Sequence, residues 1–189
     1  MEFRRPSWLL LMSLALVAQG CSKGDTGPTG PPGPTGSANV IYSRWYDPGT
    51  APDAAWALVP LFGIQERTFT MTSTSITQAV IDNGVALVYI KFAGLGGAIE
   101  KLPVSVPDID ESFNYRPMAG SILALYWKTS APGTDPGVLP TGNMVRFILI
   151  PGVVPAASVQ LAGDYRASLI SELKSMTYQE ICRKYNIPE

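Results

Sequence analysis

The sequence predicts a mainly β fold: an antiparallel β-sandwich with a short C-terminal helix, preceded by a signal peptide and an extended collagen-like tether. Apolar runs of roughly four to eight residues recur between turn residues, as in sandwich strands. Only 15% of the 189 residues are charged, which disfavours long exposed helices. About 150 residues remain for folding, enough for one domain. We therefore divide the chain into a signal peptide (1–20), a lipidated tether (21–37) and a sandwich domain (38–189).

Residues 1–20 have the pattern of a lipoprotein signal peptide. Arg4 and Arg5 form a basic head, and residues 8–18 are apolar. This run is shorter than the roughly 20 residues that span a bilayer, but it fits the apolar core of a signal. Gly20 and Cys21 then resemble a lipobox, so Cys21 should carry the membrane-anchoring lipid, with palmitate among its acyl chains. The alternative is an ordinary signal peptide that happens to contain a cysteine.

The tether is marked by glycine at every third position. Glycine occupies positions 24, 27, 30, 33 and 36, and three of the four triplets contain proline. This is the collagen repeat, in which only glycine fits the crowded axis. Because four triplets are short for a triple helix, we expect a single-chain spacer of roughly 40 Å and a monomer. A trimer seeded by the folded domain is the alternative.

The strands of the domain are predicted from β-branched and aromatic runs. The predicted strands are 40–46, 56–62, 67–71, 85–92, 99–106, 112–115, 121–127 and 144–150. The run 85–92 is apolar at nearly every position, so it should be covered on both faces. Pro103 and Pro107, in and beside 99–106, indicate an edge strand.

Shorter signals fill the gaps between these strands. Residues 75–84 predict a short helix or turn, capped by Ser75 or Thr77 and ended by Asn83-Gly84. Residues 94–97 are glycine-rich and predict a hairpin turn, and residues 130–142 predict a long loop.

The C-terminal helix is predicted from a capping box. Thr177 should be the N-cap of the helix, and the Glu180 side chain should accept a hydrogen bond from the backbone N–H of Thr177. Apolar side chains follow at helical spacing, and Asn186 ends the helix. Two helical turns are marginal alone, so the helix must dock on the sandwich. Docking would bury Cys182 as a small core residue, the alternative being a reactive thiol.

Several chemistries are excluded by composition. The chain has no histidine, so Ser-His-Asp and Cys-His nucleophilic sites and histidine zinc sites are not possible. If Cys21 is lipidated, Cys182 has no disulfide partner. A net charge of −1 gives no electrostatic basis for a nucleic-acid partner. We expect no cofactor, no catalytic residues and no enzymatic activity.

One acidic cluster and three tryptophans are candidate ligand sites. Asp108, Asp110 and Glu111 are spaced so that they could share Ca²⁺, although the spacing is not that of an EF-hand. A solvated loop is expected first, and a glycosidase carboxylate pair is a third interpretation.

The tryptophans Trp45, Trp56 and Trp127 could form a stacking platform for sugars. In the pairs Trp45-Tyr46 and Tyr126-Trp127, one ring should lie on each face of a strand. Packing in the sandwich core is the default alternative, because aromatic side chains dominate such cores.

Four further segments carry a family resemblance. They are residues 39–43 with Trp45, residues 76–89, residues 145–152, and residues 176–182 with 186–188. With Cys21 and the Gly-x-y triplets, they resemble the collagen-like-repeat lipoproteins of Bacteroidota-type bacteria along nearly the whole chain. The resemblance implies a cell-envelope lipoprotein whose β-rich domain has no assigned activity.

We therefore expect a lipid-anchored envelope lipoprotein that displays a non-catalytic β-sandwich interaction module on a proline-rich stalk. Ser22 after the lipidated cysteine favours the outer membrane, by resemblance to other lipoproteins. The expected partners are the membrane, through Cys21, and a protein or glycan. A carbohydrate-binding module that uses exposed Trp and Tyr is the alternative function.

Overall fold

The computed structural model describes residues 40–50, 53, 55–152 and 159–189. The chain divides into two units, Met1–Thr35 and Gly36–Glu189, and all the described residues belong to the second. The predicted signal peptide 1–20, the lipidation residue Cys21 and the tether 21–37 lie outside the described residues. None of the helices in the described residues has the length and apolar character needed to span a membrane.

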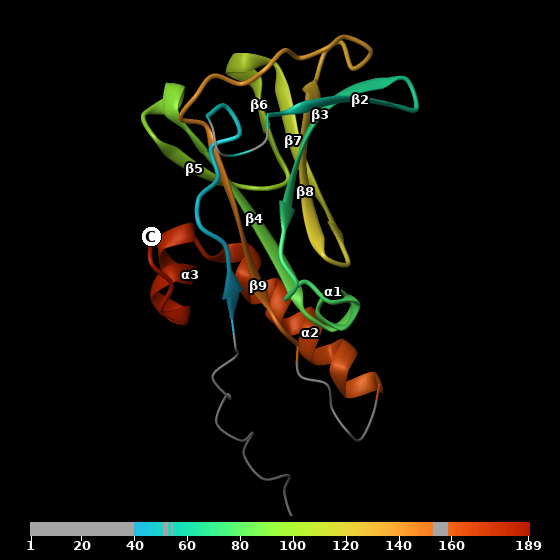
Figure 1. Cartoon of the computed structure of the whole chain (residues 1–189). Helices are drawn as coiled ribbons and strands as arrows, with labels where there is room; N and C mark the ends of the chain where they lie inside the picture. The colour runs from blue at the N-terminus through green and yellow to red at the C-terminus, as the bar shows by residue number, and fades with distance from the viewer. Residues whose placement is uncertain (1–39, 51–52, 54, 153–158) are drawn as a thin grey trace, which may run out of the picture. The chain divides into compact units, whose positions relative to one another are not determined.

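The domain contains two antiparallel sheets packed face to face (Figure 1). Sheet A has the strand order β1-β9-β4-β5, and sheet B has the order β2-β3-β8-β7-β6. The strands are β1 (Ile41–Tyr42), β2 (Ala57–Leu61), β3 (Ile64–Thr72), β4 (Val85–Phe92), β5 (Ala98–Lys101), β6 (Val104–Val106), β7 (Glu111–Met118), β8 (Ser121–Lys128) and β9 (Met144–Ile150). The prediction of a mainly β, antiparallel sandwich is confirmed.

The predicted edge strand 99–106 is in fact two strands in different sheets. β5 pairs with β4 in sheet A, and β6 pairs with β7 in sheet B. The chain crosses between the sheets at residues 102–103. Both strands are edges, so the edge position was predicted correctly and the continuity was not.

The predicted first strand 40–46 is shorter than expected. β1 ends at Tyr42. Beyond it, the Ser43 N–H donates to the Phe147 carbonyl at 3.0 Å, and an isolated bridge joins Tyr46 to Val145. The ladder stops because the N–H of Phe147 bonds to the hydroxyl of Ser43 at 3.0 Å instead of to its carbonyl. The carbonyl of Ser43 accepts a hydrogen bond from Arg146 at 2.9 Å instead.

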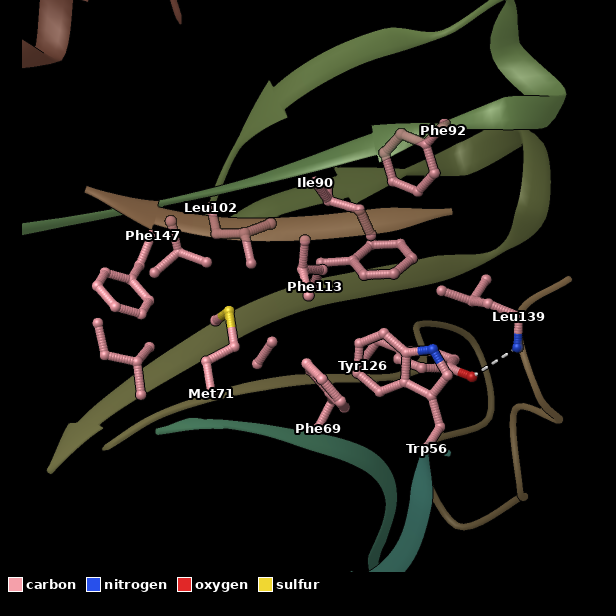
Figure 2. Packing of buried hydrophobic residues seen from close by; sticks show 14 of the residues in the cluster. Trp56, Phe69, Met71, Ile90, Phe92, Leu102, Phe113, Tyr126, Leu139 and Phe147 are labelled. Carbon is pink, nitrogen blue, oxygen red and sulfur yellow. Dashed lines mark hydrogen bonds between the residues drawn. The ribbon is translucent and has the colours of Figure 1, made fainter. Parts of the chain in front are cut away.

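The interior of the sandwich is built on aromatic rings (Figure 2). Phe113 stacks on Tyr126 with ring centroids 5.2 Å apart, and Trp56 meets Tyr126 edge-on at 4.9 Å. The hydroxyl of Tyr126 accepts a hydrogen bond from the N–H of Leu139 and donates one to the carbonyl of Gly137. The ring therefore fastens the loop 130–142, which contains no helix or strand as predicted, to the core.

The outer face of sheet A carries a second core beneath two helices (Figure 1). From β4, Val88 and Ile90 point into the sandwich, whereas Leu87 and Tyr89 point towards the helices. The strand is therefore covered on both faces, as its continuous apolar sequence predicted.

The predicted C-terminal helix is α3 (Tyr178–Tyr185). The Thr177 hydroxyl accepts a hydrogen bond from the Glu180 N–H, and the Glu180 carboxylate accepts one from the Thr177 N–H. Asn186 adopts the left-handed conformation that ends the helix. The capping box and the helix end are confirmed.

A longer helix, α2 (Val159–Ser175), was not predicted. Leu169 and Leu173 are its buried contacts with the second core. Its C-terminal end is held by Lys101, whose ammonium group donates to the carbonyls of Leu173, Lys174 and Met176. A cation is favourable there, since helix carbonyls leave negative charge at that end.

The short helix α1 (Gln78–Asn83) precedes β4. Thr77, not Ser75, is its N-cap, and its hydroxyl accepts a hydrogen bond from the N–H of Val80. Gly84 ends the helix, as predicted. A Cβ at this position would lie 2.6 Å from the carbonyl oxygens of Val80 and Ile150, so only glycine allows this close approach of the backbones.

Candidate functional site

The best candidate site is a cavity of about 370 Å³ between α2 and the start of β4. Helices α1 and α2 both contact this end of β4 (Figure 1). The cavity is floored by β4 and walled by α2, and its other side is closed by α1 and by residues of β7. Its volume is within the range of small-molecule sites, at the lower end.

Most of the cavity wall is apolar. Val85 and Leu87 contribute from β4, and Ile170 and Leu173 contribute from α2. Tyr115 of β7 also lines the cavity, but its hydroxyl donates a hydrogen bond to the Ala86 carbonyl at 2.8 Å. The wall therefore offers mainly hydrocarbon surface, which favours an apolar ligand body.

The charged residues of the wall are all cations: Lys101, Arg166 and Lys174. Arg166 donates from Nε to the Gly84 carbonyl at 3.0 Å and from Nη2 to the Ile81 carbonyl at 3.4 Å. Within the described part of the chain, Lys101 also donates only to carbonyls. None of the ion pairs among the described residues includes any of the three cations.

The environment of Lys101 reflects this lack of negative charge. Burial is the sole cause of its pKa shift, and it lowers the pKa below the usual range. A carboxylate within contact distance would have acted in the opposite direction. Among the described residues of its wall, the cavity has three cations and no acidic residue.

The three candidate tryptophans lie in three separate places. Trp56 is 3% exposed and packs in the sandwich core. Trp45 packs against Tyr178 on the outer side of sheet A, with ring centroids 5.6 Å apart. Trp127 lines a shallow groove of about 180 Å³ beside Ser105 and Ser112 of sheet B. The structure therefore does not bring these rings together as one stacking platform.

The predicted alternation within the aromatic pairs is confirmed. Tyr126 is fully buried in the sandwich, whereas its neighbour Trp127 faces outward. In the same way, Tyr46 packs on the sandwich core and Trp45 on the second core.

The three candidate calcium ligands have separate contacts. The Asp110 carboxylate accepts hydrogen bonds from the N–H and hydroxyl of Ser130. Glu111 is buried and pairs with Lys128 at 3.3 Å, whereas Asp108 is exposed. In the part of the chain that the structure describes, no three His, Cys, Asp or Glu side chains are grouped to hold a metal ion. These three carboxylates therefore do not form a shared site.

Glu111 predicts a distinct dependence of stability on pH. Burial raises its pKa, and the hydrogen bond from Lys128 opposes this only in part. A carboxyl with a raised pKa in the folded state contributes stability below its unfolded pKa, and this contribution is lost as the pH rises through the folded pKa.

We expect Glu111→Gln to gain in stability relative to the wild type as the pH rises from about 4 to 7. Urea denaturation at several pH values measures this difference. Asp108→Asn, at an exposed position of the same segment, is the matched control. A parallel pH profile for Glu111→Gln and the wild type would contradict the prediction.

Cys182 is 2% exposed in the second core. Burial raises the pKa of its thiol, which disfavours the reactive thiolate. Its predicted role as a small core residue is confirmed.

Comparison with protein-family models, curated proteins and solved structures finds no match to this chain. The function is therefore argued from the residues themselves. The cavity was not predicted because Lys101 and Arg166 are far apart in the chain and α2 gave no clear signal in the sequence. The uninterrupted apolar run of β4 was the one available signal, since it predicted a covering layer on sheet A.

Proposed function

We propose that this chain is a lipid-anchored cell-envelope protein whose β-sandwich is a non-catalytic binding module. The observation that carries the proposal is the run from Arg4 to Cys21: a basic pair, an apolar segment too short to span a bilayer, and Gly20 before the cysteine. Acyl chains on Cys21 would hold the protein at a membrane, since each buried CH₂ contributes about 0.8 kcal/mol. We propose the outer membrane as its site.

The Gly-x-y triplets and the fold support a display role. The triplets end at Gly36, and the first described strand begins at Ile41, so an extended spacer would separate the anchor from the domain. The chain lacks histidine. The domain contains an apolar cavity, and the charged side chains described in its wall are all positive. These features favour binding over nucleophilic catalysis.

Replacing Cys21 by serine should abolish lipidation. In a bacterial host fed radiolabelled palmitate, we expect the wild-type chain to carry label and to sediment with outer membranes. Cys21→Ser should carry no label and should retain its leader, because the modified cysteine would be absent.

Cys182→Ser is the matched control, because it removes the other thiol and leaves residues 1–37 unchanged. It should be labelled like the wild type. Label that persists in Cys21→Ser, or that is absent from the wild type, would rule out the proposed anchor.

A further inference from the structure

We infer that the cavity between α2 and β4 binds an anionic amphiphile, a medium-length alkyl chain with a carboxylate, whose headgroup contacts Arg166. This inference concerns the folded domain and does not depend on the anchor at Cys21. Four features lead to it: the apolar wall, the charges, the free donors and the shape of the cavity.

The first feature is the apolar wall. Leu87 is buried, and Ile170 is partly buried at the edge of the second core. Leu102 and Pro103, at the crossing between the sheets, extend the wall. Filling the cavity with hydrocarbon would remove this apolar surface from water, which favours binding.

The second feature is the absence of a carboxylate from the described residues of the wall. The wall contains three cations and no carboxylate, and the undescribed segment 153–158 contains no acidic residue by sequence. Carbonyls satisfy the hydrogen bonds of Lys101 and Arg166. The partial negative charge at the C-terminal end of α2 offsets only part of the charge of Lys101. An anion in the cavity would supply the remaining negative charge, and in an apolar setting such a pair is stronger than in water.

The third feature is the number of free donors. The ammonium of Lys101 has three N–H groups, and it makes three hydrogen bonds to carbonyls. The guanidinium of Arg166 has five N–H groups, and among the described residues only its Nε and Nη2 donate to carbonyls. Arg166 can therefore still bind a carboxylate, whereas Lys101 contributes charge alone.

The fourth feature is the shape of the cavity along α2. Arg166, Ile170 and Lys174 lie on one side of the helix at four-residue spacing. At 1.5 Å per residue, Arg166 and Lys174 are roughly 12 Å apart. With the ligand carboxylate at Arg166, its alkyl chain would extend past Ile170 towards Leu173. Lys174 would lie at the far end of the cavity.

The experiment uses the full chain in neutral phosphatidylcholine vesicles and dodecanoic acid that carries a photoreactive diazirine. We expect cross-links to concentrate on peptides containing residues 85–87 and 166–174. Unlabelled dodecanoate should compete, whereas dodecan-1-ol and dodecylamine should compete at least about tenfold less well, because one charge-assisted hydrogen bond corresponds to a factor of that size.

Two variants test the cations separately. Arg166→Gln should weaken dodecanoate binding about tenfold. Lys174→Glu should weaken it by a smaller factor, about threefold, because its charge lies about 12 Å from the carboxylate. Since Lys174 is exposed, this variant should keep the fold even if Arg166→Gln does not. Arg183→Glu is the matched control, since Arg183 is also exposed in the last turn of a helix but lies outside the cavity, and it should bind like the wild type.

Three outcomes would overturn the inference. The first is equal competition by the alcohol, and the second is cross-linking spread evenly over exposed apolar sites such as Phe62. The third is unchanged binding in both cation variants. A chain without lipid at Cys21 but with these cross-links would disprove the anchor and leave the cavity site intact.

Discussion

Arg146→Ala is expected to lower the free energy of unfolding by about 4 kcal/mol. Arg146 is 3% exposed and donates to the Tyr178 hydroxyl at 2.5 Å, the Pro188 carbonyl at 2.9 Å and the Ser43 carbonyl at 2.9 Å. Truncation would leave these oxygens without a donor, and each buried unsatisfied group costs about 1–3 kcal/mol. The guanidinium also lies 5.3 Å from the centre of the Trp45 ring, a contact that would be lost as well.

Urea denaturation followed by circular dichroism measures this loss. Arg183→Ala, on the exposed side of α3, is the control and should remain within about 0.5 kcal/mol of the wild type. Arg146→Lys should fall between the two, because a lysine keeps the charge but lacks the planar fork that reaches several oxygens. An Arg146→Ala variant within about 1 kcal/mol of the wild type would refute the assigned role.

Tyr126→Ala should lower the free energy of unfolding by about 3–5 kcal/mol, as for other large aromatic side chains in cores. Tyr126 is fully buried between Trp56 and Phe113. Tyr126→Phe keeps the ring and removes only the hydroxyl. It should lower the free energy by about 1–3 kcal/mol, because the Leu139 N–H and the Gly137 carbonyl would lose their partner.

The comparison of the two variants separates ring packing from the attachment of the loop. Hydrogen exchange at Leu139 should speed up in Tyr126→Phe, since its N–H would no longer be held at 3.1 Å by the hydroxyl. Tyr165→Phe, at a half-exposed position of α2, is the matched control. If Tyr126→Phe is as stable as Tyr165→Phe, the hydroxyl does not hold the loop.

Local sequence signals predicted the elements whose stability is local. The capping box at Thr177 and Glu180 defines the start of α3, and the apolar run of β4 predicted cover on both faces. Segments whose structure depends on distant partners were predicted less well. The end of β1 depends on Arg146, about a hundred residues further along the chain.

The candidate site also depends on residues that are distant in the sequence. Lys101 and Arg166 come together only because sheet A and α2 pack as they do. Helix α2 was missed because its apolar residues do not follow a clear helical repeat along the sequence and Gly163 interrupts it. The exposure of the tryptophans also depended on tertiary structure, as the burial of Trp56 beside Tyr126 illustrates.

The contacts of Arg146 also constrain the order in which the domain folds. Ile41 pairs with Leu149, and Arg146 joins Ser43 to Pro188, so the first strand finds its partners only after most of the domain has been delivered. Contacts so distant along the chain form late and slowly. If the chain is exported residue by residue, β1 cannot pair with β9 until residue 149 has crossed, and Arg146 cannot join Ser43 to Pro188 until residue 188 has crossed. Sheet A is therefore completed late in transport, and its link to the C-terminal segment forms last.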